Sequence, residues 1–518
     1  MAKLTRVGGN AVIVTQIKCN DRSSLGVRLQ TAAVSAACVR IPDYTNNLGT
    51  PVRKLSALDL AFFLAESEGS PKHVAGLMLF RKPTGNTRNF GRRLIDELRR
   101  HDQPTEPFNL VIHFTGLTGP HWQPAPDFDI DQHVFYHRPR KSSTWNEVKE
   151  LVSSLHEPVM DRSRPLWEYH LIDGIEGGRF AVYIRIHHAY ADGMTMTSWL
   201  QKTLSEAPDD MTLRPVWTMP PPRSRRKGVN RKSLAGGLRD LGSQSMSQIL
   251  TAGGIAKLAT QQVLERTGIT RRAVSLQFNT THKTPLTGSA TAGRRIATAC
   301  LGMDDVKSVC AATRTTLNHL ALGCIDGALH RYLHETGYPV DHPLTIQMPV
   351  NLRKDGKDRS GNMVGVALVE LGDPESDPIR RLQDIGHSLH KVRNQVDSVP
   401  GDAMQQYTVI SALTAELIDK LHLSDHIPAT GHTLVSNVPG PQQTLYLKGA
   451  RLEQNYPISI LVPGLRMNIT LFSCSGILNF GIVATKDLEQ LDLLGSCIES
   501  EFEIIRQAVD GANKRKDA

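Results

Sequence analysis

The clearest alternation of apolar and polar positions lies in residues 181–188, AVYIRIHH. A period of two predicts a β-strand whose successive side chains point to opposite faces of a sheet. One face is aliphatic until it ends in an imidazole: Val182, Ile184, Ile186 and His188. His187 lies on the other face. The pattern therefore predicts a strand that delivers His188 to the edge of an apolar space.

The residues after this strand predict a turn and then a helix. Asp192 and Gly193 form a turn pair, and the run MTMTSWLQKTL follows them directly. Asp192 is therefore expected at the point where the chain turns into the helix.

Hydrophobic periodicity predicts a mixed α/β chain elsewhere. Apolar positions at helical spacing indicate helices at residues 55–66, 89–100, 145–155, 303–314, from 318 onward, and at 488–509. Apolar runs indicate strands at residues 74–80 and 344–350. The uncharged run 467–485 is long enough to suggest a membrane span, but its polar residues favour two strands around the turn SCSG. Any membrane contact is therefore expected to be peripheral.

Composition along the chain predicts five segments. They are a disordered extension at 1–52, a first half at 53–212, a basic connector with a possible helix at 213–288, a second half at 289–510 and a tail at 511–518. Residues 223–232 of the connector carry several Arg and Lys side chains and no acid. A basic run beside an apolar helix can dock on an anionic lipid surface, whereas a solvated linker is the alternative.

Overall charge narrows the classes of partner. The chain of 518 residues has 60 Lys and Arg against 51 Asp and Glu, a formal charge of +9. Aromatic residues are 5% and no nucleic-acid motif occurs, so an anionic membrane surface or a phosphate-bearing substrate is favoured over nucleic acid. The 7 cysteines are scattered without a CxxC pair, which argues against a disulfide framework or zinc site and for a reducing compartment.

His188 admits three chemical interpretations. A neutral imidazole can serve as a general base at physiological pH. A capping histidine, satisfied by backbone groups at a strand end, is the structural alternative. A metal site is disfavoured, because His187 and His188 point to opposite faces and His188 with Asp192 supplies too few ligands. No P-loop, GxGxxG, GxSxG or HExxH motif occurs, which argues against nucleotide, dehydrogenase, serine-esterase and zinc-protease chemistry.

Several motifs in order along the chain resemble one enzyme family. HHAYADG fits the HHxxxDG motif of acyl-CoA-dependent acyltransferases built like chloramphenicol acetyltransferase. PLW at 165–167, an LSxLD-type helix at 55–59 and SNVPGP from Ser436 resemble the bacterial wax ester synthase/diacylglycerol acyltransferase family specifically. One position departs from the family, because His319 stands where an Asn-Asp pair usually has Asp.

The resemblance implies a fold and a set of roles. The expected architecture is α/β, with two chloramphenicol-acetyltransferase-like halves, each a mixed sheet with helices, and an active-site tunnel between them. The implied roles are His188 as catalytic base, His187 as its support, Asp192 as a structural residue, Gly193 as room for substrate and Asn318 as an orienting residue. Trp167 of the PLW motif is a candidate substrate contact, with core packing as the alternative.

The resemblance also implies an activity. A fatty acyl group would pass from acyl-CoA to diacylglycerol or a long-chain alcohol, giving triacylglycerol or wax ester without metal or cofactor. The expected location is cytoplasmic, with peripheral contact at the inner membrane or at lipid inclusions. Two alternatives stay open: another enzyme with the HHxxxDG fold, such as a condensation domain, and a non-catalytic lipid-surface protein.

Overall fold

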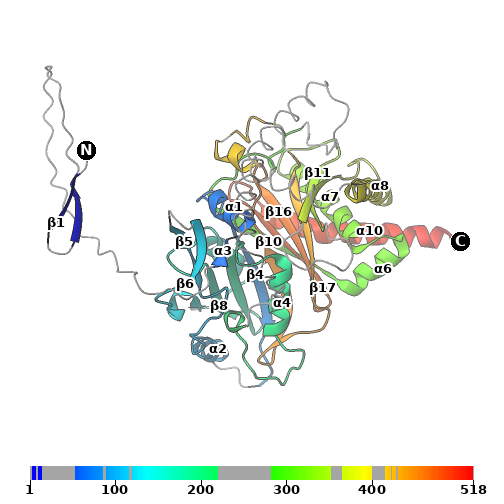
Figure 1. Cartoon of the computed structure of the whole chain (residues 1–518). Helices are drawn as coiled ribbons and strands as arrows, with labels where there is room; N and C mark the ends of the chain where they lie inside the picture. The colour runs from blue at the N-terminus through cyan, green and yellow to red at the C-terminus, as the bar shows by residue number, and fades with distance from the viewer. Residues whose placement is uncertain are drawn as a thin grey trace, which may run out of the picture. The chain divides into compact units, whose positions relative to one another are not determined.

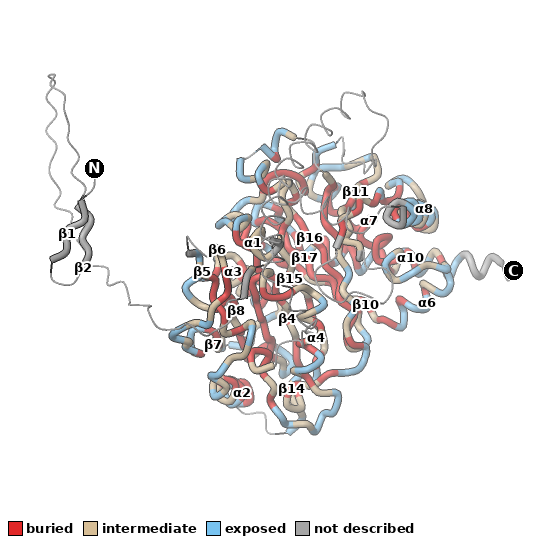
Figure 2. The backbone as a smooth tube through the Cα atoms, in the orientation of Figure 1, coloured by how far each residue is buried: buried red, intermediate tan, exposed pale blue. Residues whose placement is uncertain are grey.

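The structure is a computed structural model of the 518-residue chain, shown in Figure 1 and, coloured by burial, in Figure 2. It describes residues 3–7, 10–14, 53–55, 57–85, 89–115, 119–139, 141–219, 282–351, 364–398, 415–421, 423–427 and 430–516. The chain divides into two compact units, Met1–Pro51 and Val52–Ala518.

The described part of the first unit is a β-hairpin. Strand β1 (Lys3–Val7) pairs with strand β2 (Asn10–Val14) in antiparallel fashion. This differs from the expectation of a disordered extension over residues 1–52. Both strands contain β-branched residues, and the intervening Gly8 and Gly9 are a sequence that favours two-residue hairpin connections.

In the second unit, the described residues include a six-stranded sheet centred on the strand with the double histidine. In spatial order its strands are β14 (Tyr446–Leu447), β15 (Ala450–Ile458), β4 (His73–Arg81), β9 (Arg179–His187), β8 (Trp167–Ile175) and β7 (Val134–His137). Strand β9 pairs with β4 on one side and β8 on the other, and it is buried from Phe180 to His187. Its central position explains why most of its residues are apolar.

A second six-stranded sheet lies in the C-terminal half of the described residues. In spatial order its strands are β10 (Arg294–Gly302), β17 (Ile477–Thr485), β16 (Met467–Cys474), β13 (Thr433–Pro439), β11 (Thr345–Asn351) and β12 (Val364–Glu370). The turn between β16 and β17 has positive φ at Ser475 and Gly476, which confirms the predicted pair of strands around SCSG. Helices α7 (Leu317–Glu335), α8 (Pro378–Ser398) and α10 (Leu491–Lys516) pack against one another in this half (Figure 1).

The remaining elements cover the sheets and connect them. They are β3 (Arg53–Lys54), α1 (Ala57–Ala65), α2 (Phe90–Leu98), β5 (Leu110–Thr115), β6 (Gly119–Pro124), η1 (Ile130–Gln132), α3 (Trp145–His156), α4 (Gly193–Thr203), η2 (Val216–Thr218) and α6 (Met303–Thr313). Strands β3, β6 and β5 form a small sheet of their own. Helix α3 begins with a capping box between Thr144 and Glu147.

One strand pair crosses between the halves. Strands β14 and β15 follow β13 in sequence, yet β15 pairs with β4 and so completes the first sheet. The fold is therefore two sheet-based α/β halves joined by a crossover, and the predicted architecture is confirmed.

Three further expectations concern the C-terminal tail, the basic run and a membrane span. Helix α10 continues to Lys516, into the segment expected to be a tail; Ala512 and three basic residues in that segment are good helix formers. Residues 220–281, with the basic run 223–232, lie outside the described residues. Within the described ranges, no helix is long and apolar enough to cross a bilayer.

Candidate active site

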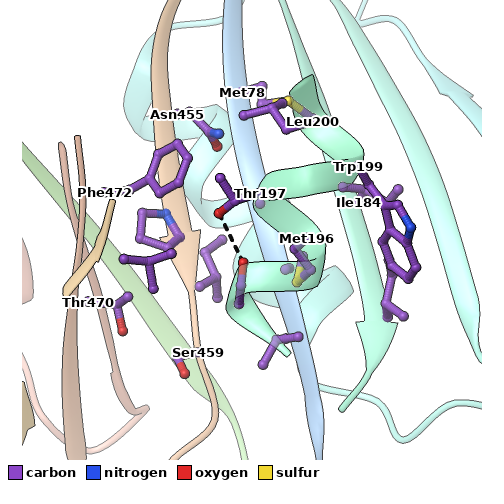
Figure 3. Close-up of a pocket in the computed structure, with 18 of the residues that line it drawn as sticks. Met78, Ile184, Met196, Thr197, Trp199, Leu200, Asn455, Ser459, Thr470 and Phe472 are labelled. Carbon is purple, nitrogen blue, oxygen red and sulfur yellow. Dashed lines mark hydrogen bonds between the residues drawn. The ribbon is translucent and has the colours of Figure 1, made fainter. Parts of the chain in front are cut away.

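A cavity of about 750 Å³ is lined by residues of both halves. Strands β4 and β9 and helix α4 contribute from the first half, and β11, β13, β15 and β16 contribute from the second. Figure 3 shows Ile184, Trp199 and Leu200 on one side, with Thr470 and Phe472 across from them; these side chains are labelled there among others. The cavity is therefore a space shared between the halves.

The aliphatic face of β9 forms part of the cavity wall. Val182, Ile184, Ile186 and His188 all line the cavity, as the alternation predicts. Strand β9 itself ends at His187, so half-buried His188 is the first residue of the following turn. Its N–H donates to the Lys72 carbonyl at 2.8 Å, which ties this turn to the residue before β4. The imidazole thus lies where the apolar wall ends.

Two consecutive phenylalanines of helix α1 stack on the two consecutive histidines. Phe62 stacks on His188 with ring centroids 4.4 Å apart, and Phe63 stacks on His187 at 4.3 Å. Both ring pairs are close to parallel, with interplanar angles of 18° and 12°. Helix α1 therefore holds both imidazoles in fixed planes, and Phe62 also lines the cavity.

His187 points away from the cavity towards a buried carboxylate. Its Nδ1 accepts the N–H of Ala189 at 3.2 Å, and its Nε2 lies 3.5 Å from Oε1 of Glu66. Because Nδ1 accepts, the neutral ring carries its proton on Nε2, facing the carboxylate. His187 thereby fixes the backbone of the turn that carries His188.

Glu66 joins several groups around this turn, although its side chain is only 2% exposed. Its Oε1 accepts the Lys72 N–H at 3.2 Å, and its Oε2 accepts from Arg162 at 3.0 Å. Burial alone would raise the pKa of Glu66, but His187, Arg162 and the Lys72 backbone favour the charged form and lower the pKa to about 2. The site therefore contains a carboxylate behind His187 that is ionised at neutral pH.

The environment of His188 keeps the imidazole neutral. Burial lowers the pKa of His188 from 6.5 to about 4, and the nearby His187 acts in the same direction. A neutral imidazole has a lone pair that can accept a proton, and at neutral pH this ring is in that form.

Asp192 and Gly193 begin helix α4 at the edge of the cavity, and both line it. Asp192 is the N-cap, and its Oδ1 accepts the N–H of Thr195 at 2.7 Å. A Cβ placed on Gly193 would lie 3.2 Å from Cγ2 of Val438 on β13. Glycine therefore lets the first turn of α4 approach the opposite half closely.

Asn318 reaches the cavity only through a second asparagine. Its Oδ1 accepts a hydrogen bond from Nδ2 of Asn437, which lines the cavity. The neighbouring His319 instead pairs through Nε2 with the carbonyl of Leu382 on α8. A Cβ on Gly386 would lie 2.6 Å from the His319 ring. A ring N–H can donate to this carbonyl whereas a carboxylate would be repelled, so histidine suits the position.

The structure places Trp167 in the core and not in the cavity wall. The side chain is fully buried, and its Nε1 donates to the Phe108 carbonyl at 2.8 Å. Its ring stacks on those of Trp217 and His133, with centroids 5.1 Å and 4.5 Å away. The proposed substrate contact of Trp167 is therefore not supported, because its indole is fully occupied by packing.

Some functional residues could not be found from the sequence. Nothing in the local pattern marks Glu66 or Phe62, because the arginine and histidine side chains that they contact lie 96 or more positions further along the chain. The polar residues Ser436, Thr470 and Asn468 also line the cavity, although the last two occur in a run that reads as ordinary buried strand. In the described part of the chain, no group of three or more His, Cys, Asp or Glu side chains is arranged to hold a metal ion.

Two family models match this chain. The model of the wax ester synthase/diacylglycerol acyltransferase catalytic domain matches residues 55–321, and that of the WS/DGAT C-terminal domain matches residues 360–506. A protein of Mycobacterium tuberculosis that carries the name "Probable diacyglycerol O-acyltransferase tgs2" is 32% identical over 456 residues. This similarity covers 87% of the chain and 98% of that protein.

Solved structures are similar as well. The wax ester synthase/diacylglycerol acyltransferase of Marinobacter aquaeolei VT8 has a TM-score of 0.68 at 25% identity, over 88% of this chain and 100% of that one. The first condensation domain of the calcium-dependent antibiotic synthetase has a TM-score of 0.51 at 14% identity, over 88% and 97%. At that identity the second likeness concerns the fold alone.

Proposed function

The chain belongs to the wax ester synthase/diacylglycerol acyltransferase family, and we propose that it transfers a fatty acyl group from acyl-CoA to diacylglycerol or a long-chain alcohol. The single observation that carries the proposal is the position of His188. A neutral imidazole lies at the end of an aliphatic wall, in a cavity that both halves line. A general base beside an apolar substrate site is what O-acylation of a fatty alcohol requires.

The cavity has dimensions that suit a long acyl or alkyl chain. Its lining includes strand β4 from Val74 to Phe80, a stretch of about 20 Å at ~3.3 Å per residue. The volume of about 750 Å³ is in the range of sites that enclose a whole small ligand. An extended long-chain acyl group would thus run beside the aliphatic face of β9 with its reactive end near His188.

The proposed reaction is a direct transfer. His188 accepts the proton of the acceptor hydroxyl as the alcohol oxygen attacks the thioester carbonyl. The C–S bond then breaks, and the protonated imidazole returns the proton to the coenzyme A thiolate. Asp192 holds the turn and the start of α4, while His187, Glu66 and the two phenylalanines hold the imidazole in place.

A thiol-release assay tests the activity. We expect purified protein to release free thiol from palmitoyl-CoA when hexadecanol or a dipalmitoylglycerol is present, with one ester formed per thiol. Without an acceptor, no burst of thiol should occur, because a direct transfer forms no acyl-enzyme. An inert protein would contradict the proposed activity, and an acceptor-independent burst would contradict the direct mechanism.

The pH profile follows from the pKa of His188. Since burial lowers that pKa to about 4, the base stays unprotonated until the pH falls close to that value. We expect kcat/KM to stay level from pH 7 to about 5 and to fall at lower pH. A raised pKa of His188 would instead shift this fall in kcat/KM to higher pH. A decline already centred near pH 6.5 would mean that the catalytic histidine is solvated.

Narrowing the cavity should change the preferred chain length. Val182 lines the cavity and lies opposite Met78 of β4, part of the way along the wall from His188. We expect Val182→Phe to lower kcat/KM for a palmitoyl or hexadecyl chain about tenfold relative to an octanoyl or octyl chain. The comparison uses a series of acyl-CoA chain lengths and a series of alcohol chain lengths, because either chain could occupy the part of the cavity beside Val182. Unchanged preferences in both series would contradict the assignment of the cavity.

We also propose that the protein is cytoplasmic and contacts lipid peripherally, at the inner membrane or at lipid inclusions. Both proposed acceptors are apolar and reside in lipid, and the basic run 223–232 carries charge that an anionic surface attracts. Deleting 223–232 is expected to weaken binding to anionic liposomes while thiol release from detergent-dispersed substrate persists. Liposome binding equal to that of the full chain would exclude this role for the run.

A further inference from the structure

A chain of hydrogen bonds crosses the wall of the cavity that the second half provides. Ser436 Oγ of β13 donates to Thr470 Oγ1 of β16 at 3.0 Å, and Thr470 Oγ1 donates to Asn468 Oδ1 at 3.0 Å. Asn468 Nδ2 then donates to the Ile460 carbonyl at 2.7 Å. All four residues line the cavity. Figure 3 shows Thr470 on the strands opposite helix α4.

This chain of bonds has a fixed direction. The Asn468 Nδ2 group donates to the Ile460 carbonyl, which leaves the amide oxygen of Asn468 facing Thr470. An amide oxygen can only accept, so Thr470 donates its single hydroxyl proton to that oxygen. Thr470 must therefore accept from Ser436, which spends its own proton in the same way. What Ser436 can offer to a molecule in the cavity is the lone pairs of its oxygen.

The two inner residues of this chain of bonds are buried, and the cavity around them is lined mainly by apolar side chains. Thr470 and Asn468 are 4% and 1% exposed, and the wall across the cavity is the aliphatic face of β9. Buried polar groups in an apolar space cost free energy unless they are paired, and here the pairing is complete except at the cavity end. An acceptor in such surroundings discriminates strongly between ligands that can donate and ligands that cannot.

Ser436 also lies close to the catalytic turn. Val438, two residues further along β13, shares its face of the strand and is the residue that Gly193 approaches. The hydroxyl is therefore about 7 Å along the strand from the start of α4, well within the reach of a substrate whose reactive end is at His188.

We propose that Ser436 is an acceptor subsite that binds a hydrogen-bond donor of a substrate in this cavity. The proposal rests on the proposed function, since one candidate donor belongs to its acyl-CoA substrate and the other to a monoacylglycerol, which has one acyl chain fewer than its diacylglycerol acceptor. One is a second free hydroxyl on a glycerol-based acceptor, as in a monoacylglycerol. The other is an amide N–H of the pantetheine arm of acyl-CoA. Both candidates would donate an O–H or N–H hydrogen bond to the Ser436 Oγ atom.

A shape-matched pair of variants isolates the oxygen. Ser436→Thr keeps the hydroxyl, and Ser436→Val replaces it with a methyl group of the same outline; both residues suit a strand. Ser436→Ala serves as a second deletion in case the valine variant does not fold. Ser473→Ala is the matched control, because it removes a hydroxyl from β16 at a position that does not line the cavity.

The assay measures kcat and KM for palmitoyl-CoA with hexadecanol and with a monoacylglycerol as acceptors. If the donor is the second hydroxyl, Ser436→Val should lose about tenfold in kcat/KM with monoacylglycerol only. If the donor is the pantetheine amide, the KM for palmitoyl-CoA should rise about tenfold with either acceptor. In both cases Ser436→Thr, which keeps the oxygen, should lose much less than Ser436→Val, and Ser473→Ala should behave as the wild type.

Two results would overturn the proposal. One is a valine variant equal to the threonine variant with every substrate. The other is a fall in kcat alone, equal for all substrates with unchanged KM values, because loss of a contact that already forms in the bound substrate must raise a KM or distinguish the two acceptors. The proposed function fails in a different way, through absence of thiol release by the wild-type protein in the same assay.

Discussion

Replacing His188 by alanine is expected to lower kcat for thiol release by about 10²–10⁴-fold. The imidazole is the proposed proton acceptor at the cavity, and two titratable neighbours on the same turn cannot take its place: His187 points to the other side of the sheet, and Asp192 is occupied as a helix cap. The KM for palmitoyl-CoA should change little, because the cavity walls stay intact. Steady-state kinetics with hexadecanol measure both quantities.

The matched control is His334→Ala, which removes an exposed imidazole from the last turn of α7. Both variants should keep the thermal unfolding midpoint within a few degrees of the wild type. A His188→Ala variant that keeps full turnover would exclude His188 as the base.

Replacing Glu66 by glutamine should have the second largest effect. The carboxylate accepts on both oxygens, from Arg162 on one and from the Lys72 N–H on the other, and it faces the His187 ring. A glutamine side chain has one acceptor oxygen and one donor NH₂ group. Either Arg162, or the Lys72 N–H together with the His187 ring, must therefore lose its acceptor. We expect kcat to fall about 10- to 100-fold through the displaced His188, and stability to fall by about 1–3 kcal/mol.

Because Glu66 acts through other residues, its test needs a readout beyond activity. The pH profile should change: without the carboxylate the turn loosens, water enters, and the acid limb should move upward from about pH 4 towards the ordinary histidine value. Glu68→Gln is the control, since Glu68 is exposed on the same segment. Equal kinetics and equal pH profiles for the two variants would rule out a positioning role for Glu66.

Alternation along a strand was sufficient to predict the cavity wall. Val182, Ile184 and Ile186 line the cavity because the side-chain period of a strand is two, and the same period sends His187 to the opposite face. The Asp192 cap followed from the turn pair before a helical run. Such features depend on neighbours within a few residues, and sequence reasoning finds them reliably.

The parts that sequence reasoning missed depend on distant partners. Phe62 and Phe63 read as an ordinary apolar stripe, and only the packing of α1 against the turn shows that they stack on the histidines. Glu66 acquires its role from burial beside Arg162, a contact across 96 positions of the chain. For Trp167, core packing was one of the two interpretations of the sequence, and the structure adds its partner Trp217.

The family resemblance was informative at Asn318 and incomplete at His319. The asparagine reaches the cavity through Asn437, a residue of the SNVPGP segment, so the two motifs meet in space. The histidine turns towards Leu382 and Gly386 of α8, which explains why the site can lack the usual aspartate there.

The most direct test of the central claim is a crystal structure with S-hexadecyl-CoA, a thioether that cannot transfer its chain. We expect the alkyl chain to lie along Val182, Ile184 and Ile186. The sulfur should lie near the His188 imidazole, with room for the hydroxyl group of the acceptor between them. A chain bound elsewhere, or a sulfur separated from His188 by protein, would contradict the claim that this histidine serves a cavity shared by both halves.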